Sequence, residues 1–125
     1  MNDQSDRLRN GLPPPPVPQR LRELLKNYPG HILRLQEVLD SVAEDHAKSI
    51  PLFEQAIWAL ESRTSAFIRE AQTELEAAQA IGDLDAIVLA EAKEDLMFSA
   101  RSLNDGLSDL NEVWGYFEMH KDALK

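Results

Sequence analysis

The sequence of 125 residues lacks cysteine altogether, which excludes disulfide bonds, thiol nucleophiles and thiolate metal sites. Glycine is scarce, and its five residues lie too far apart to form a phosphate-binding loop. The patterns Gly-x-Ser-x-Gly and Gly-x-Gly-x-x-Gly and the P-loop pattern are all absent. The sequence therefore contains no motif of a serine hydrolase, a dinucleotide-binding enzyme or a P-loop NTPase.

Long apolar runs are lacking as well. No segment approaches the ~18 consecutive apolar residues of a membrane-spanning helix, and the first ten residues are polar and charged, unlike a signal peptide. We therefore expect a cytoplasmic protein that makes no membrane contact. Basic residues are in the minority, because 13 Lys and Arg against 22 Asp and Glu give a formal net charge of -9. This acidity argues against nucleic-acid binding, which needs a basic face for the phosphates.

Residues that favour β-strands are also few. Val, Ile and Thr together number 13, whereas Ala, Leu, Glu and Gln dominate, and no stretch shows a sustained period-two alternation. The composition therefore predicts an all-α fold. The length suits one domain with a single core.

Prolines are concentrated in one place, since five of the seven lie within residues 13–18. Such a run favours the extended polyproline II conformation. We therefore predict a flexible, proline-rich tail over residues 1–17 and a helical bundle domain over 18–125. Pro15, Pro18 and Arg20 fit a Pro-x-x-Pro-x-Arg pattern that SH3-type grooves recognise, although a stiff spacer is the favoured interpretation.

Apolar spacing in the domain predicts four helices, at residues 18–28, 31–47, 50–80 and 84–123. Gly82 followed by Asp83 predicts a tight turn between the last two, because glycine commonly ends a helix and aspartate begins one. The last helix carries apolar residues in a heptad rhythm close to that of a coiled coil, broken only by Lys93 and Lys121.

These helices predict an antiparallel hairpin within a three-helix bundle, with the short N-terminal helix as a lid near the hairpin turn. The alternative is that helices 31–47 and 50–80 form one bent rod. The register of the hairpin places Glu74 beside Lys93, so we expect an ion pair that fixes this register. The last helix is longer than its partner, and we expect a homodimer to cover the overhang, with Trp114 and Leu124 among its contacts.

Candidate catalytic and metal sites are not found. His31, His46 and His120 have no Asp or Glu three or four residues away, the spacing that a metal-binding helical bundle needs. The carboxylates fall mainly outside the seams, which is typical of a solvated face. We therefore predict no catalytic residue, no metal and no cofactor.

Large apolar residues outside the seams, together with Phe117 in the seam near the end of the last helix, are candidates for a partner-binding site. The candidates are Trp58, Tyr116, Phe117 and Met119. Burial in the core is the alternative for these side chains. In size, acidity and helical character the chain is similar to small bacterial secretion chaperones and helical adaptor proteins, a likeness of composition that transfers no functional residue.

The resulting hypothesis is a non-catalytic helical protein-protein interaction module, adaptor-like or chaperone-like, that self-associates through the C-terminal hairpin and binds a protein partner. The alternative is a helical-bundle enzyme or small-ligand carrier, with a cavity between the two long helices near Glu74 and Lys93.

Overall fold

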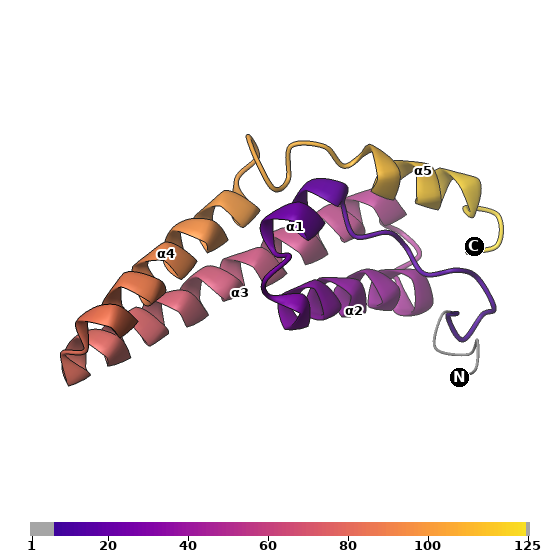
Figure 1. The fold of residues 1–125 in the computed structure, drawn as a ribbon. Coiled ribbons are helices and arrows are strands. Elements are labelled where there is room, and N and C mark those ends of the chain that lie inside the picture. The colour runs from indigo at the N-terminus through magenta and orange to yellow at the C-terminus, as the bar shows by residue number, and fades with distance from the viewer. Residues whose placement is uncertain (1–6, 125) are drawn as a thin grey trace.

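A computed structural model describes residues 7–124 and shows an all-α fold, with no strand among the described residues (Figure 1). The helices in chain order are α1 (Gln19–Leu24), α2 (Pro29–Asp45), α3 (Leu52–Ile81), α4 (Leu84–Arg101) and α5 (Asn111–Met119). The long helix α3 is central, because α2, α4 and α5 all pack against it, while α1 packs against α4. The predicted helical bundle is therefore confirmed.

The turn between α3 and α4 forms where the sequence predicts it. Gly82 adopts φ +81°, a left-handed conformation that favours glycine, and its N–H donates to the carbonyl oxygen of Ala78 at 3.0 Å. The carboxylate of Asp83 then accepts hydrogen bonds from the backbone N–H groups of Asp85 and Ala86. These caps end one helix, begin the next, and make α3 and α4 an antiparallel hairpin.

Helix α2 folds back along the first half of α3, which excludes the bent rod. The side chain of Gln55 holds the intervening loop, because its amide nitrogen donates to the carbonyl oxygens of Ala47 and Ile50, both at 2.8 Å. At the other end of α2, Arg34 donates two hydrogen bonds to the carboxylate of Glu70, at 2.7 and 2.6 Å. These contacts fix α2 against α3 at both ends.

The single helix predicted over residues 84–123 is wrong, because the chain leaves the helical path between α4 and α5. Gly106 turns the chain sharply: its N–H donates to the carbonyl oxygen of Ser99 at 3.0 Å. A Cβ at Gly106 would lie only 2.1 Å from the carbonyl oxygen of Ala100, so no other residue fits this approach without movement. Asp109 then accepts a hydrogen bond from the N–H of Asn111, at the start of α5.

This break removes the overhang that the sequence predicts at the C-terminal end. After the turn, α5 lies over the first part of α3 instead of continuing α4 (Figure 1). Phe117 and Leu124 are buried against the rest of the molecule. The C-terminal end therefore needs no second copy of the chain to cover these two side chains.

The proline-rich segment is packed against the bundle. Residues 1–6 of the predicted flexible tail lie outside the described residues, whereas Leu8 and Val17 are buried. The hydroxyl of Tyr116 donates to the carbonyl oxygen of Pro13 at 2.6 Å, and the amide of Gln36 donates to that of Pro15 at 2.7 Å. From residue 7 onwards, this part of the predicted tail belongs to the folded structure.

The lid helix also differs in position from the prediction. Helix α1 lies near the C-terminal end of α4, away from the hairpin turn (Figure 1). Glu112 of α5 accepts a hydrogen bond from the backbone N–H of Gln19 at 3.0 Å and pairs with Arg22. Because a carboxylate at a helix N-terminus satisfies a free N–H group, α5 holds the first turn of α1 in place.

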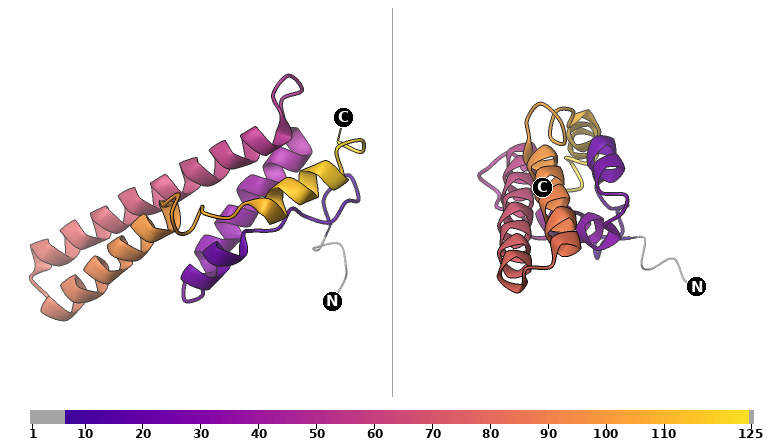
Figure 2. Two further views of the ribbon diagram at one scale, coloured as in Figure 1. Left: turned by 90° about the horizontal axis from the view of Figure 1, so that it is seen from above. Right: turned by 60° about the vertical axis from the view of Figure 1, so that its left-hand side comes forward.

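The far end of the α3–α4 hairpin projects from the molecule, as two views show (Figures 1 and 2). Helix α2 has only 17 residues against 30 in α3, and its first turns reach α3 at Phe67 and Glu70. The last ten residues of α3 extend about 15 Å further, at 1.5 Å per residue. The fold therefore leaves an overhang at the hairpin turn.

Candidate interaction surface

The projecting part of the hairpin, residues 72–95, is called the hairpin tip below. Alanines occupy much of the seam between its two helices: Ala78 of α3 is buried, and Ala86 and Ala90 of α4 are half-buried, as are the larger Leu75 and Ile87. Small side chains allow the two helices to approach closely but bury little apolar area. The seam therefore takes in only part of the apolar side chains of the tip.

Four other large apolar residues of the tip face the solvent. Ile81 is 80% exposed, Leu84 76%, Val88 63% and Leu89 72%. Leu84 and Val88 are four residues apart and share one side of α4, while Leu89 lies roughly 140° around the helix from Leu84. A helix that is apolar on more than one side is normally covered on each of them, and exposed apolar groups of this kind mark interaction sites.

The hairpin tip is also strongly acidic. It contains seven acidic residues and one basic residue, which gives a net charge of -6 out of -9 for the whole chain. Its single cation, Lys93, already binds Glu74, with the ammonium nitrogen 2.9 Å from a carboxylate oxygen. Within residues 7–124, no ion pair involves the remaining acidic residues of the tip, which are Glu76, Asp83, Asp85, Glu91, Glu94 and Asp95.

An aromatic and cationic cluster fixes the base of the hairpin tip to the bundle. The ring of His31 lies 4.2 Å from that of Phe67 and 5.5 Å from that of Tyr28. The guanidinium of Arg34 lies 4.8 Å from the Phe67 ring centre, and the ammonium of Lys93 lies 5.0 Å from that of Tyr28. The tip therefore extends from a fixed base.

Burial lowers the pKa of His31, and the positive charges of Lys93 and Arg34 lower it further. The carboxylates of Glu70 and Glu74 oppose this shift. Arg34 in turn lowers the pKa of Glu70 through their hydrogen bonds. The cluster thus favours a neutral His31 imidazole beside two ion pairs, Arg34–Glu70 and Lys93–Glu74.

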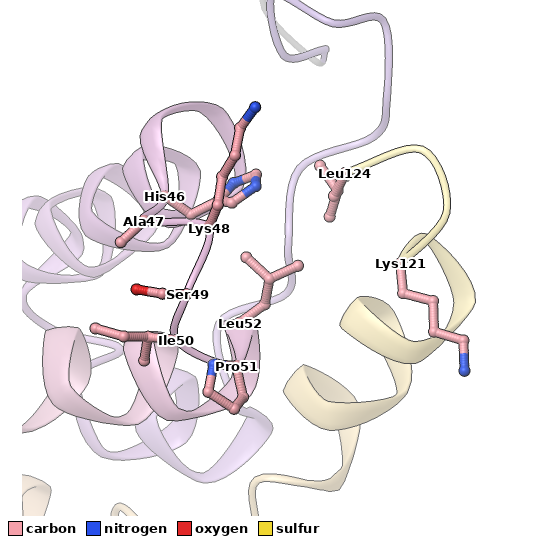
Figure 3. Close-up of a pocket in the computed structure, with 9 residues that line it drawn as sticks. All are labelled: His46, Ala47, Lys48, Ser49, Ile50, Pro51, Leu52, Lys121 and Leu124. Carbon is pink, nitrogen blue, oxygen red and sulfur yellow. The ribbon is translucent and has the colours of Figure 1, made fainter.

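The largest pocket described lies at the opposite end of the molecule, between the α2–α3 loop and the C-terminal segment (Figure 3). It has a volume of about 560 Å³ and is open to solvent, with apolar side chains that include Leu52 and Leu124. Lys48 and Lys121 also line it, but their side chains extend in different directions (Figure 3). The Nδ1 atom of His46 lies 3.0 Å from the carbonyl oxygen of Val42. These polar groups do not converge on a common point.

The residues that the sequence suggests for partner binding are not gathered in one patch. Trp58 and Met119 are exposed, whereas Tyr116 and Phe117 are buried. The hydroxyl of Tyr116 binds the proline-rich segment, and burial raises its pKa to about 12, with a smaller contribution from the charge of Asp40. A partner can reach Trp58 and Met119 directly, while Tyr116 and Phe117 hold the fold.

The residues predicted to fix the register or to form a dimer also lie in different environments. The expected ion pair between Glu74 and Lys93 is present, while its role in fixing the register stays a prediction. Trp114 is exposed and lines a shallow pocket of about 380 Å³ together with Phe53. Leu124 is buried within its own chain.

The Pro-x-x-Pro-x-Arg motif of the predicted tail is packed against the rest of the molecule. Pro15 and Pro18 are fully buried, and Arg20 forms ion pairs with Asp105 and Glu23. A groove of the SH3 type reaches these prolines only if the segment leaves the bundle.

The exposed residues of the hairpin tip are the ones that the sequence interpretation missed. Leu89 belongs to the predicted heptad seam, but in the structure its side chain is exposed on α4. A signal was present, because Ile87, Val88 and Leu89 are consecutive and so cannot all face one partner helix.

The described part of the chain offers few other kinds of site. No group of three or more His, Asp or Glu residues within 7–124 is arranged to hold a metal ion. No helix in this range has the length and apolarity to cross a membrane. No protein-family model matches the chain, and no curated protein or solved structure is significantly similar to it.

Proposed function

We propose that the protein is a non-catalytic helical interaction module and that the hairpin tip is its binding element. One observation carries this proposal: alanines take up much of the seam, while Leu84, Val88 and Leu89 face the solvent. In a self-sufficient hairpin the larger apolar side chains would be turned inward, because their burial stabilises the fold more than that of alanine. The arrangement suits a surface that another chain covers.

The same region gives little support to the alternative of an enzyme or ligand carrier. Its proposed cavity would lie near Glu74 and Lys93, but these two side chains bind each other, and Lys93 also lies over the ring of Tyr28. Self-association through the hairpin is the second candidate, since the exposed side chains could meet those of a second copy.

Site-specific photo-crosslinking tests the proposal. A photoreactive amino acid at Ala92 is compared with one at Ser41, and both positions are exposed. Ala92 lies one turn further along α4 than Val88 and Leu89 and, around the helix axis, between them. Ser41 lies on α2. In cells that make the protein, we expect a discrete crosslinked species of defined mass from position 92 and none from position 41. Equal crosslinking from the two positions would contradict the proposal.

A further inference from the structure

The charges of the hairpin tip distinguish between kinds of partner. A second copy that docked tip to tip would bring another net charge of -6 against the first. Like charges held together in a partly desolvated interface oppose association. The charge of the tip therefore disfavours a symmetric dimer and favours a basic surface.

The apolar residues of α4 are arranged along one side together with carboxylates. Phe98 follows Leu84 by fourteen residues, close to four helical turns, so the two share a side of α4 about 21 Å long. Both are exposed. Glu91 and Asp95 lie between them on that side. An approaching helix would meet apolar contacts toward both ends and negative charge between them.

We propose that the hairpin tip, together with Phe98 just beyond it on α4, binds an amphipathic helix of another protein, one whose apolar stripe is flanked by Lys and Arg. This inference rests on the proposed function and names the partner class. The apolar stripe of such a helix covers Leu84, Val88 and Phe98. Its basic side chains pair with Glu91 and Asp95, while their aliphatic stems lie over the apolar side chains one turn away on the same side of α4.

The test uses a synthetic peptide of Leu and Lys, about 18 residues long, arranged as an amphipathic helix that matches the length of α4. A second peptide carries Glu in place of every Lys. Binding of each labelled peptide to the full chain is measured by fluorescence anisotropy near physiological ionic strength. We expect the Lys peptide to bind at least about tenfold more tightly than the Glu peptide.

A double variant tests the location of the site. Leu84→Ala with Val88→Ala should weaken binding of the Lys peptide at least about tenfold, because burial of even one leucine can contribute a tenfold factor. The matched control is Leu33→Ala with Leu103→Ala, which truncates two leucines of similar exposure outside the tip. We expect the control to bind as the wild type does.

Three results would overturn the inference, and they separate it from the proposed function. Equal binding of the Lys and Glu peptides would reject a basic partner but leave the tip as a binding element. A wild-type dimer that the Leu84→Ala/Val88→Ala variant dissociates would do the same, with a second copy as the partner. Equal peptide binding by wild type and that variant, with no change in solution mass, would reject both.

Discussion

If the hairpin tip is open in the free protein, truncation of its leucines should hardly change stability. Leu84 is 76% exposed, so about a quarter of it is buried. Full burial of a leucine contributes about 1.5–3 kcal/mol, and a quarter of that is roughly 0.4–0.7 kcal/mol. Alanine keeps the high helix propensity of leucine, which leaves burial as the main difference. We therefore expect Leu84→Ala to lower the free energy of unfolding by less than about 1 kcal/mol.

Met97 provides the comparison on the same helix. Its side chain is fully buried, and truncation of such a residue to alanine costs about 2–5 kcal/mol. Urea unfolding followed by circular dichroism measures both variants under identical conditions. A cost for Leu84→Ala as large as that for Met97→Ala would refute the reasoning. A midpoint that rises with protein concentration would show that the folded protein self-associates, and loss of this rise in Leu84→Ala would locate the contact at the tip.

Three further predictions concern the packing that holds the hairpin in place. Gly106→Ala should destabilise the protein by about 1–3 kcal/mol in urea unfolding, because the new Cβ collides with the Ala100 carbonyl; wild-type stability would contradict the tight turn. Tyr116→Phe should cost about 0.5–1.5 kcal/mol through the lost hydrogen bond to Pro13. The folded-state pKa of Tyr116 is raised from 10.0 to about 12, so its contribution to stability is complete below pH 10.0 and is lost as the pH rises through about 12. The phenylalanine variant should lack this loss of stability at alkaline pH. His31 has a lowered pKa, so its contribution is complete above pH 6.5 and declines as the pH falls below that value. His31→Gln should flatten this dependence in parallel melts, and an unchanged slope would contradict the assignment.

Local signals explain the parts of the fold that the sequence predicts well. Gly82 and Asp83 define the hairpin turn through their own backbone and side-chain bonds, and a short turn then sets the register that brings Glu74 to Lys93. The break after α4 also had a local signal in Asn104, Asp105, Gly106 and other turn-forming residues between 102 and 109. The heptad rhythm continues across this stretch, which is why periodicity alone predicts a single helix.

The candidate site was harder to predict, because exposure depends on which element covers which. The length of α2 and its contact with Phe67 determine which part of α3 is covered by α2 and which part is left exposed. The hydrogen bonds from Gln36 and Tyr116 to the proline-rich segment join residues far apart in the sequence. The run of Ile87, Val88 and Leu89 shows that they cannot all face one partner helix, but no local pattern shows which of them faces outward.

The most direct measurement uses the absence of cysteine from the chain. Ala92→Cys places a single polarity-sensitive dye beside the exposed residues of the hairpin tip, and Ser41→Cys places the same dye on α2 as a control. On addition of the Leu and Lys peptide, we expect a blue shift of emission from position 92 and none from position 41. Equal responses at the two positions, or none at position 92, would contradict a docking surface at the hairpin tip.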